Sequence, residues 1–338
     1  GDHRDLHLSI RRQRQMCIRD RPLFFSLGTG LRFFAYVCVF SLVGAVALRW
    51  ILRAKVDQVT VAWCEAVERK LALQGIIAGF LLVACDLGRV WHQTYAFFGG
   101  FEPITFEAIR TITNETLWGS GWKLQVIAAI FAVIAFVAAY WSCPTAWLFT
   151  WPLVIIATIS RPLTGHAVEE GSWLSLPAIL QAVHVMGAAT WIGTLGTVVF
   201  IGLRHVACLD PRTRARVVAV VVNAFSPVAL TAATALFIAG TATSFMYLGS
   251  PGAIIGTTYG RVLLAKLLGF MAVVAVGFFN WQRVRPSLDS VVDLEMSHGS
   301  LTSVVEALLW RSACFEVALA AIVLVITAVL VTLPMPMG

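Results

Sequence analysis

The sequence predicts an all-α fold: a polytopic integral membrane protein built as a bundle of about eight transmembrane helices. Hydrophobic residues make up 59% of the 338 residues and charged residues only 13%, whereas about 25% of a typical soluble domain is charged. The uncharged stretches 171–203 and 217–260 are longer than the ~20 residues that a helix needs to cross a bilayer. The membrane-embedded part therefore takes up most of the chain.

Charged residues and one proline bound the first four spans. The first span ends before Arg53, and the second follows Lys70. Cys143-Pro144 splits an uncharged run into the third and fourth spans, because proline disfavours helix at the residue before it. The expected ranges are 31–52, 71–90, 121–141 and 145–160.

The last four spans are bounded mainly by arginines. The fifth ends before Arg204, the sixth follows Arg216, the seventh starts at Arg261, and the eighth follows Arg311. Their apolar runs are long enough to cross the membrane as helices. The expected ranges are 176–203, 222–248, 261–282 and 312–333.

Basic residues gather in three of the connecting loops and orient the bundle. Loops rich in Lys and Arg stay on the cytoplasmic side, so both termini and the loops near 91–120, 161–175 and 249–260 are expected outside. We interpret the formal charge of +7 as this orientation signal and expect no nucleic-acid partner. The loop residues are Arg53, Lys55, Arg69 and Lys70, then Arg204, Arg212, Arg214 and Arg216, then Arg283, Arg285 and Arg311.

Residues 1–21 do not fit this topology. They are rich in arginine, lack an apolar segment of their own and do not resemble a signal peptide. We interpret them as a non-native, artefactual segment translated from sequencing-adapter DNA. The alternative is a genuine basic arm on the membrane surface.

The remaining chain divides into two membrane halves, 31–160 and 161–338. Thr116-Leu-Trp118-Gly119 precedes the third span and Thr257-Thr258-Tyr259-Gly260 the seventh, and both read Thr-x-aromatic-Gly. A parallel duplication of a four-helix unit predicts such a repeat. Chance, or a shared preference at helix starts, explains it equally well.

His184 is the titratable residue inside the long uncharged run of the fifth span. An ionisable side chain within a membrane span marks a functional site by default, although a hydrogen-bonded packing role is the alternative. Imidazole suits copper in either oxidation state, and thioether sulfur selects Cu(I). Several further His and Met residues fall on the same expected side, which favours copper over harder ions; the candidate ligands are His184, His166, His92, Met246, Met335 and Met337.

Three more residues are candidates for supporting roles. Trp191 lies seven residues after His184, where its indole would close a pocket or pack against another span. Lys266 in the seventh span and Glu316 in the eighth are polar residues for which a structural role is favoured. Asp86 and Arg89 are expected to pair with each other.

The sequence contains no pattern typical of soluble enzyme chemistry, and we expect no enzymatic activity. It has no nucleophile elbow, phosphate-binding loop or convincing pair of carboxylates. The seven cysteines include no Cys-x-x-Cys pair, so they predict neither a disulfide framework nor a zinc or iron–sulfur site.

Gly165-His166-Ala167, His184 followed by Trp191-Ile192-Gly193, and Thr258-Tyr259-Gly260-Arg261 with Lys266 together resemble the CopD (copper resistance protein D) family of bacterial inner-membrane proteins. The resemblance implies an eight-span bundle that takes part in copper uptake or resistance, with His166 and His184 as copper-handling residues. It also implies a periplasmic CopC-type copper carrier as partner. No CopC-like soluble domain or Met-rich outward segment is seen here, so any carrier is expected to be a separate chain.

Three functions remain open at this point. The first is a copper permease of the inner membrane, with an outward His/Met site feeding a path between the two halves. The second is an electron-transfer protein with b-type haem, whose axial ligand is commonly a histidine; a second histidine at the depth of His184 is missing from the other expected spans. The third is a copper-handling assembly factor or sensor that transports nothing.

Overall fold

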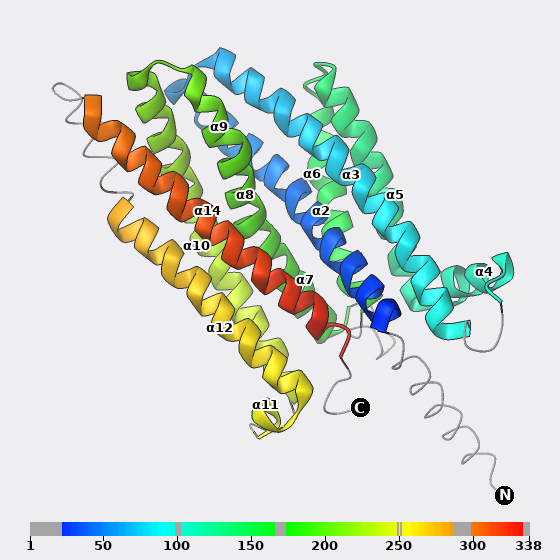
Figure 1. The fold of residues 1–338 in the computed structure, drawn as a ribbon. Coiled ribbons are helices and arrows are strands. Elements are labelled where there is room, and N and C mark those ends of the chain that lie inside the picture. Colours follow the sequence, from blue (N-terminus) through cyan, green and yellow to red (C-terminus); the bar gives the residue numbers. More distant parts are fainter. Residues whose placement is uncertain are drawn as a thin grey trace, which may run out of the picture.

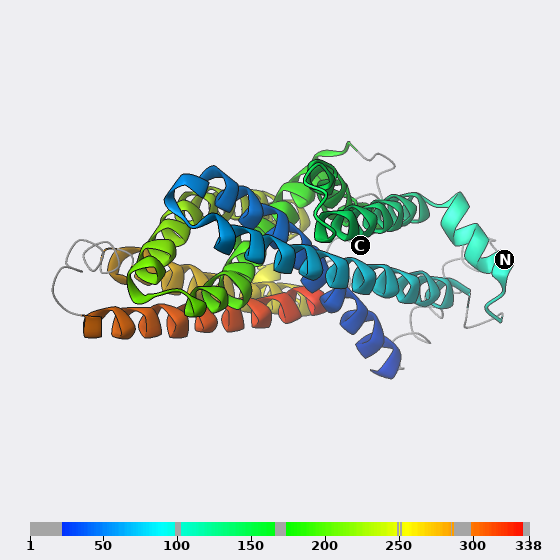
Figure 2. The same ribbon diagram turned by 90° about the horizontal axis from the view of Figure 1, so that it is seen from above.

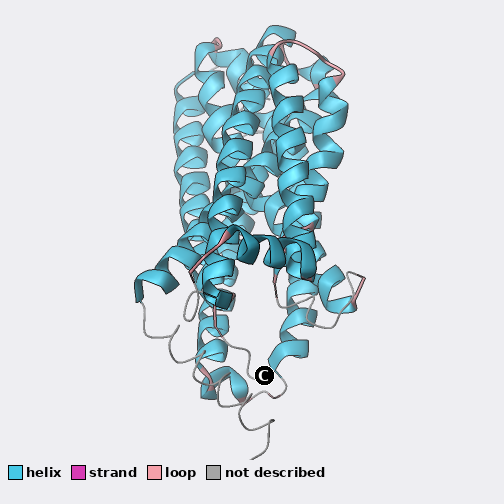
Figure 3. Ribbon diagram, turned by 90° about the vertical axis from the view of Figure 1, so that its right-hand side faces the viewer, coloured by secondary structure: helices cyan, strands magenta, loops and turns pink. Residues whose placement is uncertain are grey.

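The computed structural model describes residues 22–98, 103–165, 174–248, 252–284 and 299–333, with the single residues 250 and 286. All regular elements in these parts of the chain are helices (Figure 3). An apolar chain in lipid satisfies its backbone N–H and C=O groups within helices, because water is absent. The main helices are α2 (Pro22–Ala54), α3 (Val61–Phe98), α4 (Phe106–Glu115), α5 (Leu117–Tyr140), α6 (Ala146–Ile159), α7 (Leu176–Ala188), α10 (Pro211–Leu248), α12 (Thr258–Phe279) and α14 (Gly299–Leu330).

Shorter pieces complete the described chain. Two π-helical segments, Ala189–Gly193 and Val198–Gly202, continue the helix that α7 begins, and a third, Asn280–Val284, continues α12. Single turns of 3₁₀-helix lie at Val56–Gln58, Pro162–Thr164 and Val206–Cys208. The remaining short helices are α8 (Thr194–Thr197), α9 (Leu203–His205) and α11 (Ala253–Gly256).

The expected membrane spans are confirmed. Among the described residues, 8 helices are long and apolar enough to cross a membrane, one for each expected span. Several are longer than expected: the second begins at Val61 and the sixth at Pro211, because helix continues through the charged residues beside the apolar run. The Cys143-Pro144 hairpin is confirmed between Tyr140 and Ala146, with Ser142 at φ 66°. The protein is thus a polytopic helical membrane protein.

The long helices lie side by side, and their loops define two ends of the bundle (Figure 1). The α4/α11 end carries these two short helices together with the start of α2 and the end of α14. The opposite, basic end carries the end of α2 with Arg53, the start of α10 with Arg212, and the connections between the helices there, with Lys55 and Arg204. The structure thus gathers the basic loops at one end of the bundle.

Helix α2 joins the two sides of the bundle. It packs against α3 and α6 on one side and against α8, α10 and α14 on the other (Figures 1 and 2). Two glycines allow its closest approach: a Cβ on Gly44 would clash with the carbonyl oxygen of Gly193, and a Cβ on Gly193 with that of Phe40. Small residues permit such contact between membrane helices. This contact fixes the π-helical segment that carries Trp191.

The two Thr-x-aromatic-Gly motifs have the same local structure. The Thr116 hydroxyl accepts a hydrogen bond from the Gly119 N–H at 2.9 Å, and the Thr257 hydroxyl accepts one from the Gly260 N–H at 2.9 Å. Each threonine caps a span directly after a short helix, α4 or α11. This likeness agrees with a duplicated unit, and the division into halves 31–160 and 161–338 stays a prediction. Residues 1–21 lie outside the described residues.

Candidate functional site

His184 lies on α7, two turns after its start. Ser175 caps this helix and Pro177 stands in its first turn, where proline needs no hydrogen-bonding N–H. The imidazole Nδ1 is 3.2 Å from the backbone carbonyl oxygen of Leu236 on α10. Gly240, one turn further along α10, makes room for the ring: a Cβ there would lie 2.8 Å from both Nδ1 and Cε1 of His184.

This hydrogen bond determines which imidazole nitrogen can bind a metal. A carbonyl oxygen only accepts hydrogen bonds, so Nδ1 carries the proton and donates. Nε2 of the neutral ring is then left with the lone pair. Metal-binding histidines in proteins are oriented in the same way, by a hydrogen bond from the other ring nitrogen. Of the two ring nitrogens of His184, Nε2 is therefore the one that keeps a lone pair.

His184 lines a cavity of about 120 Å³ between α2, α7, α10, α12 and α14, which we call the histidine cavity. Its walls are mostly apolar. The polar or charged side chains that line it include Gln181, one turn before His184, and Lys266 on α12. Trp191 closes it towards the basic end and packs edge-to-face on Phe270, with ring centroids 6.1 Å apart.

A second cavity, of about 130 Å³, lies towards the α4/α11 end, and we call it the arginine cavity. It shares His184, Gln181 and Lys266 with the histidine cavity, so the two are neighbours. Residues at the helix ends, such as Thr164 and Tyr259, also line it. Its other cationic lining residues are Arg32, Arg89 and Arg161.

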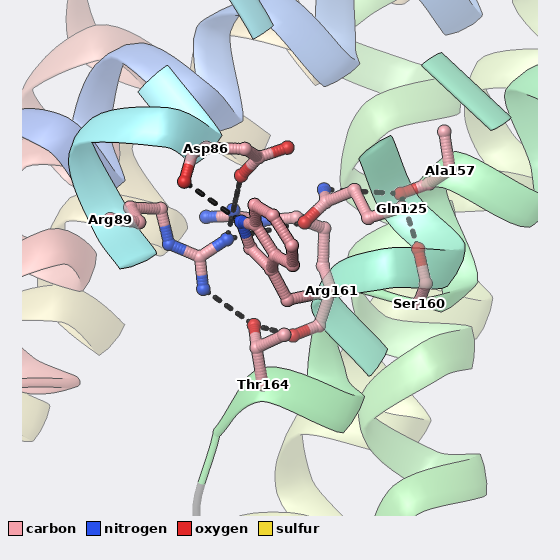
Figure 4. Close-up of polar contacts among 8 residues, drawn as sticks. Asp86, Arg89, Gln125, Ala157, Ser160, Arg161 and Thr164 are labelled. Carbon is pink, nitrogen blue, oxygen red and sulfur yellow. Dashed lines mark hydrogen bonds and ion pairs between the residues drawn. The ribbon is translucent and has the colours of Figure 1, made fainter. Parts of the chain in front are cut away.

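Two of these arginines belong to a buried polar network (Figure 4). Arg89 Nη1 donates to Asp86 Oδ1 at 2.9 Å and to Gln125 Oε1 at 3.2 Å, and Arg89 Nη2 donates to Thr164 Oγ1 at 2.5 Å. Arg161 Nη1 is 3.7 Å from Asp86 Oδ1. The expected Asp86–Arg89 pair is thus confirmed, within a larger network that ties α3, α5 and the end of α6 together.

A third cavity, of about 300 Å³, lies on the other side of Trp191, and we call it the glutamate cavity. Glu316 on α14 lines it and is 4% exposed. The Asn280 amide donates to the Glu316 carboxylate at 3.1 Å. Leu203, Trp281 and Leu309, near the basic end, line the same cavity. Trp191 therefore separates a cavity that contains an imidazole from one that contains a carboxylate.

The structure brings some of the predicted site residues together and separates others. His184, Lys266 and Trp191 line one cavity, with Glu316 beyond Trp191. His92 packs against Gly28 of α2: a Cβ on Gly28 would lie 2.5 Å from the His92 Nε2 atom. His92 is not among the residues that line the three cavities. Met246 is 38% exposed and lines none of them either. His166, Met335 and Met337 lie outside the described residues.

No resident metal centre is assembled in the described part of the chain. No group of three or more His, Cys, Asp or Glu side chains is close enough there to hold a metal ion. His184 lines a mostly apolar cavity together with the polar side chains of Gln181 and Lys266.

Sequence reasoning missed the arginine cavity. Arg32 lies inside the first expected span, 31–52, and Arg161 directly follows the fourth, but neither was singled out as a candidate site residue. An arginine within a turn of a span's outer end is a signal that could have drawn attention to them. Gln181 was also missed, although it lies three residues before His184 and therefore on the same helical face.

Comparisons with known proteins identify the family. Residues 219–330 match the family described as copper resistance protein D, and residues 25–176 match the family described as copper resistance protein D-like, N-terminal domain. Copper transport protein CutJ of Bacillus subtilis (strain 168) is 25% identical over 207 residues, which are 57% of this chain and 36% of that protein. The match therefore spans little more than a third of that relative. No solved structure matches the chain. The two family matches cover most of the described bundle, and the chain belongs to the copper resistance protein D family.

Proposed function

We propose that this protein carries copper across the bacterial plasma membrane. The observation that supports this most directly is the position of His184, which lines two of three neighbouring cavities between the α4/α11 end and the basic end. The proposed path runs from the α4/α11 end through the arginine and histidine cavities, past Trp191, to the glutamate cavity. The name of the relative CutJ, a copper transport protein, agrees with this cargo.

His184 would be the ligand that takes copper out of water and into the bundle. Neutral imidazole binds both Cu(I) and Cu(II), and the Leu236 carbonyl keeps the proton on Nδ1. A single protein ligand in an apolar cavity holds an ion weakly enough for it to leave again. Movement through the bundle requires such weak binding.

Trp191 would be the barrier between the two sides. Its side chain is 5% exposed and lines both the histidine and the glutamate cavities. It lies in the π-helical segment Ala189–Gly193, and π-helical turns occur often at functional sites. The Trp191 ring would have to move before an ion could pass, and its electron-rich face is a place where a cation can pause.

Glu316 would receive copper on the far side. The Asn280 amide orients its carboxylate, and Gly277 leaves space beside it, since a Cβ there would lie 3.1 Å from Glu316 Oε1. A buried carboxylate attracts a cation that has crossed an apolar barrier. Copper would then leave towards the basic end.

The positive-inside rule orients this path. The basic end carries the arginine- and lysine-rich loops, so it would face the cytoplasm, and the α4/α11 end would face the periplasm. Copper would therefore move inward. A separate CopC-type carrier that delivers copper at the α4/α11 end remains part of the proposal and rests on the family resemblance.

Copper accumulation in cells tests the proposal. We expect His184→Ala to lower copper accumulation to the background of cells without the protein, at an unchanged level of protein in the membrane. His205→Ala is the matched control, because His205 lies at the basic end, with its Nδ1 2.9 Å from the Ile201 carbonyl oxygen, and lines none of the three cavities. Equal accumulation by wild type and His184→Ala would contradict a transport role for His184.

Copper flux into proteoliposomes separates transport from the other copper functions. A permease moves copper into vesicles that contain this protein alone. An assembly factor or sensor does not. Absence of flux with correctly inserted wild-type protein would favour those functions.

A further inference from the structure

Positive charge gathers around the arginine cavity without enough negative charge to balance it. Arg89 and Arg161 are 7% and 5% exposed, and Arg32 and Lys266 are partly buried. No Asp or Glu is among the described residues that line the cavity. The nearby Asp86 already contacts both Arg89 and Arg161. One carboxylate cannot neutralise four cationic side chains in a medium of low dielectric constant.

Two nitrogen atoms of the Arg161 guanidinium also lack a hydrogen-bond partner in the described part of the chain, although one of them lies 3.7 Å from Asp86 Oδ1. Its Nε and Nη1 atoms are buried and have no hydrogen-bond acceptor among the described residues. The ring of Tyr36 lies 4.6 Å from the guanidinium carbon; it supports the flat face of the group and leaves the N–H donors at its edge unused. Buried polar atoms without partners are rare in proteins and need an explanation, of which a bound ion or water is one.

We propose that the arginine cavity binds a small oxyanion of the carboxylate or phosphate class. The fork of guanidinium N–H groups matches the oxygens of these anions, and the free Nε and Nη1 donors of Arg161 are available to them. Arg32 and Lys266 line the same cavity, so their positive charges would attract the anion. A cavity of about 130 Å³ holds a small anion with a few waters, given that one water needs on the order of 10–15 Å³.

This site has a consequence for the proposed copper path. A copper ion that enters the empty arginine cavity meets cationic side chains of its own sign before it reaches His184. A bound oxyanion removes this repulsion and offers oxygen ligands beside the imidazole. The consequence rests on the proposed function, whereas the anion site itself does not.

Binding of inorganic phosphate to the purified protein in detergent, without copper, tests the site. We expect saturable binding, with acetate as a competitor. Arg161→Gln should weaken phosphate binding at least about tenfold, as the loss of a charge-assisted hydrogen bond does. Arg32→Gln is a second variant that leaves the Asp86 network intact, and it should weaken binding in the same direction.

Matched controls come from the basic end. Arg204→Gln and Arg311→Gln remove exposed arginines far from the cavity and should leave phosphate binding unchanged. Equal binding by wild type and both cavity variants would overturn the proposal. So would a failure to detect binding of either phosphate or acetate.

Two further arms identify the source of the oxyanion. In nanodiscs of phosphatidylglycerol, a lipid headgroup that fills the site would block phosphate binding, whereas nanodiscs of phosphatidylcholine would leave it open. Equal phosphate binding in both would indicate a free anion. A double variant, Glu169→Gln with Glu170→Gln, tests the carboxylates that follow Gly165 in the sequence: phosphate binding by this variant but not by wild type would overturn the proposal, because the chain itself would supply the anion.

Discussion

His184 donates a hydrogen bond from Nδ1 to the backbone carbonyl oxygen of Leu236, 3.2 Å away. The donor is on α7 and the acceptor on α10, so the bond joins two spans inside the bundle. It keeps Nε2 unprotonated and fixes the plane of the ring. The proposed copper ligand thus depends on how closely α10 approaches α7, and Gly240 sets that approach.

Gly240→Ala should therefore lower copper uptake without removing any ligand. The new Cβ would lie 2.8 Å from Nδ1 and Cε1 of His184, so the ring must turn away from the Leu236 carbonyl. Loss of the group that orients a metal-binding histidine commonly costs about 10–100-fold in affinity or activity. Copper uptake into proteoliposomes, measured against copper concentration, should show this loss.

Gly196→Ala is the matched control for this variant. Gly196 lies in the same membrane span as His184, and a Cβ there would meet nothing within 4 Å. Its uptake should equal that of wild type. If Gly240→Ala transports as well as Gly196→Ala, the orientation of His184 does not limit transport.

Removal of the Trp191 side chain should make the bundle permeable to protons. Trp191→Ala joins cavities of about 120 and 300 Å³ into one continuous space that water can enter. We expect proton leak in the absence of copper, measured with a pH-sensitive dye inside liposomes. Trp191→Phe keeps an aromatic ring in place and should not leak protons.

The stability of the Trp191 variants must be measured in parallel. Truncation of a buried tryptophan to alanine costs about 3–5 kcal/mol, so thermal unfolding in detergent shows whether a leak comes from the folded bundle. A folded Trp191→Ala protein that does not leak would contradict the barrier role.

The sequence predicted the spans well but the cavities poorly, and the reason is physical. A run such as 222–248 is long and apolar enough to be placed in the membrane whatever its neighbours are. The arginine cavity instead depends on contacts between distant residues: Arg89 and Thr164 are 75 positions apart and meet only when α3 packs against the end of α6. Asp86 and Arg89 were predicted as a pair because they are one helical turn apart.

The candidate metal ligands were chosen by their expected depth in the membrane, and depth alone does not predict which side chains meet. Depth along a helix follows from residue number, whereas the direction of a side chain depends on packing. His92 and His184 lie on the same expected side, yet His92 packs against Gly28 and His184 lines the cavities. The π-helical turn at Trp191 could not be predicted from the sequence either. It is accompanied by a close contact between Gly44 and Gly193, which are far apart in sequence.

Asp86→Asn should destabilise the bundle strongly. Asp86 is fully buried and is the carboxylate next to both Arg89 and Arg161, so its loss leaves two buried cations without a countercharge. Removing one partner of a buried ion pair costs about 3–5 kcal/mol. Thermal unfolding in detergent should show a clear fall in Tm for Asp86→Asn. The exposed Asp57→Asn at the basic end should unfold like wild type, and equal unfolding of both variants would show that Asp86 is dispensable.

The two threonine caps should contribute equally to stability if the motifs are equivalent. Thr116 and Thr257 each accept a hydrogen bond from a glycine N–H at 2.9 Å, and each hydroxyl donates to a carbonyl of the preceding short helix, Ile112 or Ala253. Replacement of a capping threonine by alanine costs about 1 kcal/mol, so Thr116→Ala and Thr257→Ala should each lower the free energy of unfolding by about that amount. The serine variants at both positions keep the hydroxyl and should retain most of the stability. A large loss at one cap and none at the other would mean that the two motifs share a sequence pattern but not a structural role, and would remove the main structural argument for a duplicated four-helix unit.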